Sequence, residues 1–404
     1  MDEPMVFPYD DPAFVTDPYP FYAALRAPGP VRRVATARGV EAWLIARYED
    51  GLAALSDPRF SSDLRDATDV RLLDQLPTTE RESFMRSMIR VGPPDHTRLR
   101  RLVSKAFTVR RVAALRPRVQ ELTDGLLDAV LPAGRADLVA DFALPLPVTV
   151  ISELLGVPAA DREGFQKWTD IMLAQHPDRV DKEVMDDAWR RMWSYLEDLL
   201  ADKRATPGDD LLSALIAARD SEGSLSEDEL LSMAFLLLVA GYVTTVNLIG
   251  GGVLALLANP TQLKLLRDDP GLLPGAVEEF LRYDGPVNPG IIRFPTEDVE
   301  IGGVTIPRGA TVLIATAIAD RDPEHFADPD RLDVTRTENA HLAFGHGLHY
   351  CLGAPLARLE GEIAIGTVLR RLPNLALAVP YAELEWQVGS LRGPRRLPVT
   401  FTPA

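Results

Sequence analysis

The run of residues 230–263, which contains no charged side chain, is the feature that most limits how this chain can fold. An apolar segment of this length either crosses a membrane or forms the buried centre of a large protein. Thr244, Thr245 and Asn247 interrupt the run, and acidic rather than basic residues precede it. We therefore predict one long helix over residues 226–258 in the core of a mainly helical protein.

The composition fits one large domain. Of the 404 residues, 46% are apolar and 25% are charged, which provides enough apolar surface for a large core. No linker, low-complexity tract or internal repeat divides the sequence. We therefore predict a single domain over residues 1–404.

The formal net charge of −16 argues against binding to nucleic acid or to anionic lipid. A single cysteine excludes internal disulfides and cysteine-clustered zinc sites, and it fits a reducing compartment. The acidic start of the chain lacks the basic and apolar regions of a signal peptide. We expect a cytoplasmic protein that binds neither nucleic acid nor a membrane.

The only cysteine, Cys351, lies in a glycine-rich segment over residues 341–358. Gly345, Gly347 and Gly353 allow positive φ and close backbone approach. An apolar run typical of a helix follows, so we expect Cys351 at a helix start, where free N–H groups favour a thiolate. Such a sulfur is a good ligand for a soft metal centre such as haem iron. The alternative is a small buried hydrophobic residue.

This segment resembles the haem-binding loop of the cytochrome P450 family, Phe-x-x-Gly-x-[His/Arg]-x-Cys-x-Gly. Its fixed positions are filled here by Phe344, Gly347, His349, Cys351 and Gly353. The resemblance implies that Cys351 binds the iron of haem b (iron protoporphyrin IX), with Phe344, Gly345 and Gly353 beside the cofactor.

A basic helix is predicted after Pro94, and it places His96 and Arg100 on one face. By itself this pattern indicates a solvated basic face. The resemblance implies instead that His96 and Arg100 hold the haem propionates, together with Arg293 on a predicted strand and His349 in the cysteine loop.

The middle of the long apolar helix resembles the oxygen-binding segment of the family. Ala240 and Gly241 then leave room for dioxygen, and Thr244 helps to deliver protons. The family has an acid before this threonine, but the residue here is Val243. Proton delivery must then use water, a substrate hydroxyl or another side chain, or the enzyme runs a variant reaction.

Glu279 and Arg282 resemble the Glu-x-x-Arg pair of the family. Arg331 is expected as the third member of a buried Glu–Arg–Arg network. The resemblance gives these three residues a structural role.

A substrate pocket is expected from three parts of the chain and from the centre of the apolar helix. For the residues before the basic helix, a surface loop is an equal alternative, and for Trp168 and Met172 ordinary core packing is one. The expected pocket residues are Met85, Met88, Ile89, Trp168, Met172, Leu236, Val239, Val287, Pro289, Gly290, Ile291 and Leu391.

The expected fold class is mainly α with a small β-rich region. The β-rich parts are expected at about 31–46, 286–318 and 375–401, where apolar residues alternate or turn signals are frequent. The resemblance implies the cytochrome P450 fold, a triangular domain with a long central distal helix over the haem.

The expected reaction is monooxygenation, the hydroxylation of a sizeable hydrophobic small molecule such as a secondary metabolite. Because of Val243, the alternative is epoxidation, oxidative coupling or peroxide-driven oxidation. A haem-binding module without activity and a membrane protein are further alternatives.

The expected partners are O2 and a separate ferredoxin with its ferredoxin reductase, and the enzyme is expected to be a monomer. The candidate contacts with the ferredoxin are Arg98, Arg101, Lys105, Arg110, Arg111 and Arg358.

Overall fold

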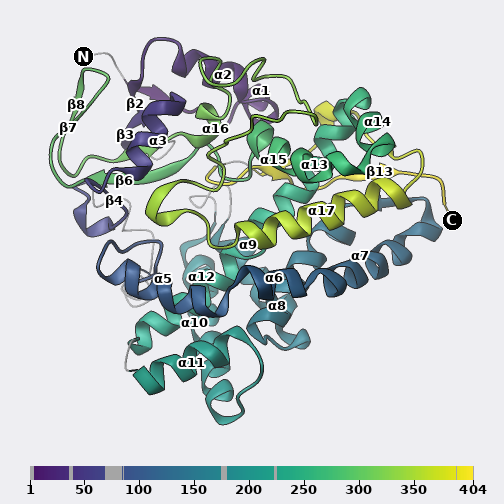
Figure 1. Ribbon diagram of the computed structural model, residues 1–404, viewed down its shortest axis with the longest axis horizontal. Helices are drawn as coiled ribbons and strands as arrows, with labels where there is room; N and C mark the ends of the chain where they lie inside the picture. The colour runs from purple at the N-terminus through teal and green to yellow at the C-terminus, as the bar shows by residue number, and fades with distance from the viewer. Residues whose placement is uncertain are drawn as a thin grey trace.

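The computed structural model describes residues 4–35, 40–68, 84, 86–173, 180–222, 225–387 and 389–403. Figure 1 shows strands β2, β3 and β6 with helices α1 to α3 in the upper left corner, and helices α10 to α12 at the bottom. The outline narrows towards α11, which gives the triangular shape. The pocket prediction for Met85 lies outside the described residues.

The apolar run forms two helices that follow one another, α12 (Glu227–Ala240) and α13 (Val243–Ala258). A turn at Gly241 and Tyr242 separates them, and glycine fits there because a Cβ would lie 2.5 Å from the carbonyl oxygen of Leu237. The predicted long helix is confirmed in its bounds, since the helical run spans Glu227–Ala258 with this turn in its middle. Of its most apolar 18-residue window, 61% is buried within the protein, as expected for a core helix.

Helix α13 packs against α15 (Leu273–Asp284) and α17 (Ala354–Arg371). Small residues allow this contact: a Cβ on Gly252 would lie 2.8 Å from Ile365 Cδ1, and one on Gly361 would lie 3.3 Å from Leu248 Cδ2. Helix α7 (Arg116–Val130) covers α17, and Figure 1 shows the two running side by side.

The remaining α-helices surround this centre. They are α1 (Pro12–Thr16), α2 (Tyr19–Arg26), α3 (Tyr48–Ser56), α5 (Asp95–Ala106), α6 (Val109–Ala114), α8 (Pro145–Leu155), α9 (Arg162–Met172), α10 (Lys182–Ala205), α11 (Leu211–Glu222), α14 (Pro260–Asp268) and α16 (Thr316–Ala319).

The main sheet has the strand order β1-β2-β3-β9-β6-β4. Its strands are β1 (Met5–Val6), β2 (Val31–Ala35), β3 (Glu41–Ile45), β4 (Phe60–Ser61), β6 (Ile291–Pro295) and β9 (Val312–Ile314). Strand β6 runs antiparallel to β9, with Arg293 opposite Val312. This pairing fixes the position of Arg293 in the sheet.

Smaller sheets complete the β structure. They are the pair β7 (Val299–Ile301) and β8 (Val304–Ile306), the pair β11 (Trp386–Gln387) and β12 (Gly393–Pro394), and the sheet of β5 (Arg135–Asp137), β10 (Ala376–Leu377) and β13 (Pro398–Thr400). Strands β1, β4 and β5 lie outside the predicted β-rich parts, because strands of two or three residues are too short to show alternation.

A buried carboxylate, Glu279, organises the segment that leads to the cysteine loop. Its side chain and that of Arg282 have no exposed surface, and Arg282 Nε donates to it at 2.7 Å. The third member of the network is Arg336, whose Nε lies 3.1 Å from Glu279 Oε2. The prediction of Arg331 was wrong: its side chain is 62% exposed and pairs with Asp333. Only its backbone carbonyl turns inwards, where it accepts from Arg282.

Candidate active site

The cysteine loop is a tight turn closed by its own backbone. The N–H of Cys351 donates to the carbonyl of Phe344 at 2.9 Å. Gly345 and Gly347 have φ of 69° and 67°, as predicted. Gly353 differs from the prediction, since it has φ of −79° as the N-cap of α17. It is close to the sulfur, because a Cβ on Gly353 would lie 3.8 Å from Cys351 Sγ.

The sulfur of Cys351 receives N–H groups from Gly353 and Ala354, which lower its pKa together with the charges of Arg100 and Arg358. Burial is the larger effect and raises the pKa of the thiol above its ordinary value. A bound metal ion lowers the pKa of the thiol that binds it, so haem iron would act against this effect of burial. The residue Cys351 as a whole is exposed.

Four basic groups from three separate elements meet beside this loop. His96 and Arg100 come from α5, Arg293 comes from β6, and the ring of His349 lies 4.3 Å from that of His96. Burial, followed by repulsion from the neighbouring cations, lowers the pKa of His96 to about 4 and that of His349 to about 3. Burial also lowers the pKa of Arg293 to about 10.

This basic cluster fits the carboxylates of a haem. Both ring nitrogens of His96 are buried without a hydrogen-bond partner among the described residues. Buried donors that repel one another are stabilised by an anion placed between them. A soft sulfur ligand beside an anion-binding cluster is a donor set that fits both the iron and the propionates of haem b.

Where α12 meets α13, one side of the otherwise buried helical run is accessible, and we call its residues the accessible stripe. Ala240 is exposed, and Leu236, Val239, Val243 and Thr244 are partly exposed, at spacings of three and four. Thr244 Oγ1 donates to the carbonyl of Ala240 at 3.3 Å. The stripe therefore offers one hydroxyl and several apolar side chains, and Val243 contributes no acid.

Two distant segments of the expected pocket come together. Val287 and Leu391 form an isolated antiparallel bridge, and both are partly exposed. Between Val287 and β6, Pro289 is buried, and a Cβ on Gly290 would overlap the carbonyl oxygen of Ile314. Ile291, the first residue of β6, is partly exposed. In the turn before α5, Met88 is buried, whereas Ile89 is 44% exposed.

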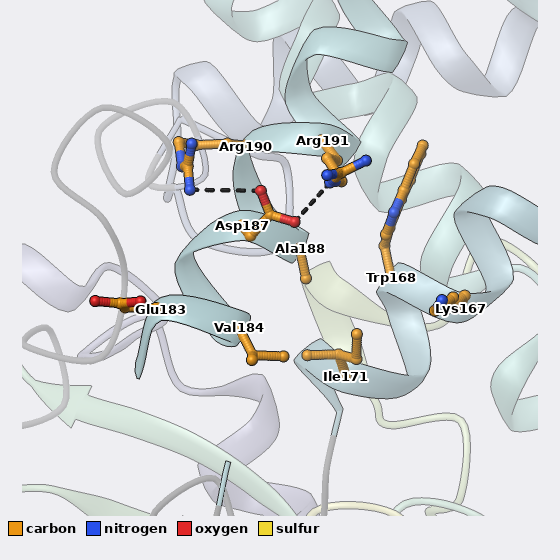
Figure 2. Close-up of a pocket in the computed structure, with 9 residues that line it drawn as sticks. All are labelled: Lys167, Trp168, Ile171, Glu183, Val184, Asp187, Ala188, Arg190 and Arg191. Atoms are coloured by element: carbon orange, nitrogen blue, oxygen red, sulfur yellow. Dashed lines mark hydrogen bonds and ion pairs between the residues drawn. The ribbon is translucent and has the colours of Figure 1, made fainter. Parts of the chain in front are cut away.

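Trp168 lines a pocket between α9 and α10, and it also packs against the main core, which was the alternative to a place in the substrate pocket. Figure 2 shows its ring next to Arg191 of α10, while Ile171 of α9 faces Val184 of α10, and these residues line a pocket of about 540 Å³. The Trp168 ring lies 5.9 Å from that of Tyr195. Phe165 and Thr169 form the buried face of α9, and Trp168 stands on the neighbouring face. Met172 packs against the main core.

A chain of contacts that the sequence did not reveal ties the cysteine loop to α15. Glu278 accepts from Arg358 Nε at 2.7 Å and lies 3.2 Å from His341 Nε2. These two partners lower the pKa of Glu278 to about 2, against the opposing effect of burial. Arg358 also lies over the Phe344 ring and donates to Tyr350. The only sequence signal was the acid directly before Glu279.

The start of the chain supports the same loop from the other side. A Cβ on Gly347 would lie 2.8 Å from the carbonyl oxygen of Leu55. Ser62 Oγ lies 3.2 Å from His349 Nε2, and the hydroxyl of Tyr48 donates to the carbonyl of Ala340. The loop is thus held by residues almost 300 positions earlier in the chain.

The predicted ferredoxin contacts are not equivalent. Arg98 bonds to Glu229 and Asp95, and Arg358 to Glu278, so these two arginines are already ion-paired. Arg101, Arg110 and Arg111 are exposed.

Comparisons with known proteins give one consistent result. The family model described as Cytochrome P450 matches residues 73–375. The cytochrome P450 monooxygenase PikC of Streptomyces venezuelae is 52% identical over 96% of this chain and 92% of its own. Mycinamicin IV hydroxylase/epoxidase of Micromonospora griseorubida is 45% identical over 99% of each chain. The crystal structure of the myxobacterial cytochrome P450 CYP267B1 with myristic acid matches with a TM-score of 0.92, at 44% identity over 96% of this chain and 98% of that one.

Proposed function

The chain belongs to the cytochrome P450 family, and from this premise we propose that it hydroxylates a sizeable hydrophobic secondary metabolite. The observation that carries the proposal is the exposed residue Cys351 beside the basic cluster of α5, β6 and the cysteine loop. The enzyme is a haem-thiolate monooxygenase, and its cofactor is haem b.

Haem b bound through Cys351 supplies oxygen activation, so that R–H, O2, two electrons and two protons give R–OH and water. The residues of this chain have distinct tasks around it. His96, Arg100, Arg293 and His349 hold the propionates by hydrogen bonds and charge. The hydroxyl of Thr244 holds a proton on the side where oxygen binds, and the apolar side chains of the accessible stripe orient the substrate and exclude water.

Two observations support the proposed substrate class: the names of two relatives and the apolar side chains at the accessible positions. PikC and the mycinamicin enzyme are named as a monooxygenase and a hydroxylase/epoxidase, and the latter acts on mycinamicin IV by its name. The accessible positions here are mostly apolar, with Val287, Ile291 and Leu391 beside the stripe of α12 and α13. We place the substrate among sizeable hydrophobic metabolites. Epoxidation is the second candidate, since Val243 alters proton supply.

A direct test loads the purified protein with haem and screens hydrophobic metabolites by the shift of the Soret band. Turnover of each ligand with a surrogate ferredoxin and reductase under labelled O2 should place one labelled oxygen in the product. A ligand that shifts the band but yields product without label would contradict monooxygenation.

An acid at position 243 should increase the fraction of the supplied electrons that ends in hydroxylated product. We expect Val243→Glu to raise the ratio of product to NAD(P)H consumed and to lower peroxide release, because general-acid help is worth about 10²–10⁴ in rate. Val243→Gln is the matched control, with the same shape and no acid. Equal ratios for both variants would show that proton supply does not depend on this position.

We propose that electrons come from a separate ferredoxin and its reductase, and that the enzyme works as a cytoplasmic monomer. The exposed Arg101, Arg110 and Arg111 lie on α5 and α6 and suit an acidic partner.

Charge reversal tests this docking surface. Changing Arg101, Arg110 and Arg111 to glutamate should slow the first reduction by about tenfold or more at low salt, because steering by charge raises association rates by that order. Substrate affinity, measured by the Soret shift, should stay unchanged. Reversal of Arg190 and Arg191 on α10 is the control. A reduction rate that does not fall would exclude this surface.

A further inference from the structure

The turn that precedes α5 contains two buried polar groups without partners. Ser87 has no exposed surface, and its hydroxyl makes no hydrogen bond among the described residues. Arg90 Nε is likewise buried and unpartnered, although Arg90 as a whole is partly exposed. The backbone fixes both, since Ser87 N donates to Phe84 and Arg90 N donates to Ser87. Burial of these two polar groups without an acceptor is costly, so their retention needs a reason.

Arg90 lies between α12 and the basic cluster. Its guanidinium carbon lies 5.3 Å from the ring centre of Phe84, and that ring packs edge-on against Phe235 of α12 at 5.9 Å. Arg90 is also close enough to Arg293 for its charge to lower the pKa of that residue. Burial lowers the pKa of Arg90 itself, and no acidic partner offsets this within the described part of the chain.

Among the described residues, the charges of this region do not balance with the cofactor alone. Haem b carries two propionate carboxylates, and Arg100 and Arg293 provide one guanidinium for each. Arg90 is a third guanidinium near Arg293, and it also lies over the ring of Phe84, which contacts Phe235 of α12. One further anion would satisfy Arg90 and the hydroxyl of Ser87 together.

We propose that Arg90 and Ser87 bind a carboxylate of the substrate. This inference rests on the proposed monooxygenase function and narrows its substrate class to hydrophobic molecules that carry one acidic group. The carboxylate would be anchored beside Arg293, with the apolar remainder of the molecule along the accessible stripe of α12 and α13. The anchor therefore fixes which carbon of the substrate reaches the haem.

The test uses straight-chain carboxylic acids of graded length and their methyl esters, titrated into the haem-loaded enzyme by the Soret shift. We expect the acids to bind about tenfold to a hundredfold tighter than their esters, the usual value of a hydrogen bond to a charged group. Arg90→Gln should remove this preference, Arg90→Lys should keep part of it, and Ser87→Ala should reduce it.

Arg65→Gln is the matched control. Arg65 lies in the same part of the chain, but its side chain is 71% exposed and already paired with Asp63. This variant should keep the full preference for acids.

Haem transfer to a haem-free acceptor protein separates the two possible sources of the carboxylate. If Arg90→Gln speeds haem loss and the wild type shows no preference for acids, Arg90 serves a propionate and the substrate assignment is overturned. If the variant changes neither property, the site is no anion site at all. Both results leave the proposed function intact, because that function fails only if the wild type lacks the carbon monoxide spectrum of a thiolate-bound haem.

Discussion

Replacement of Cys351 by serine is expected to abolish monooxygenation. A hydroxyl is a hard, weakly acidic ligand, and serine therefore cannot supply the electron density that a thiolate gives to the haem iron. As the sequence contains one cysteine, no other thiolate can take its place. The carbon monoxide complex of the reduced variant should lose the red-shifted Soret band of thiolate-bound haem, and product formation should fall below detection.

Ser62→Ala is a suitable control for this experiment. It removes the contact with His349 Nε2 but leaves the sulfur and its N–H donors in place. This variant should keep the thiolate spectrum. A Cys351→Ser enzyme that retains both the spectrum and turnover would refute the assignment of the iron ligand.

The second large effect is expected on stability. Glu279→Gln should lower the free energy of unfolding by about 3–5 kcal/mol, because it leaves the buried guanidinium of Arg282 without its counter-charge. Glu279 also accepts from the backbone N–H of Asp333 and from Arg336, so the loss spreads to the segment before the cysteine loop. Urea unfolding of the haem-loaded protein, followed by the Soret band and by circular dichroism, measures the change.

Arg336→Ala and Arg331→Ala form a matched pair for the same network. Arg336 bonds to Glu279 and to the carbonyl of Ala327, so its removal should cost about 1.5–3 kcal/mol. Arg331 is 62% exposed, and its removal should stay within about 0.5 kcal/mol. Equal costs for the two variants would contradict the network seen in the structure.

Local patterns were sufficient to predict the centre of the molecule. The absence of charge over residues 230–263 identified a core helix, because a buried helix must be apolar on all sides. The fixed spacing around Cys351 predicted a turn with positive φ at Gly345 and Gly347. Both features depend on residues that are near one another in sequence.

The sequence was less informative where the course of the backbone in three dimensions determines which side chains meet. Asp328 has φ of 46°, and its carbonyl accepts from the backbone N–H of Arg331 and from the side chain of Arg336. Beyond this turn, Arg336 rather than Arg331 reaches Glu279. No spacing rule contains this information. The two alternatives for Trp168 could not be separated from the sequence, because the side of α9 that α10 covers is fixed by tertiary packing. The turn at Gly241 was not predicted, because the space around this residue is limited by Ile151, which is distant in sequence.

The support of the cysteine loop by Tyr48, Leu55 and Ser62 has a consequence for the order of assembly. During synthesis these residues leave the ribosome long before the loop that they hold. Contacts over such a distance in sequence form slowly, because closing the long intervening chain costs entropy. We therefore expect the nascent chain to remain unable to retain haem until its last quarter has folded back onto its beginning, so that cofactor capture is a late event in the maturation of this enzyme.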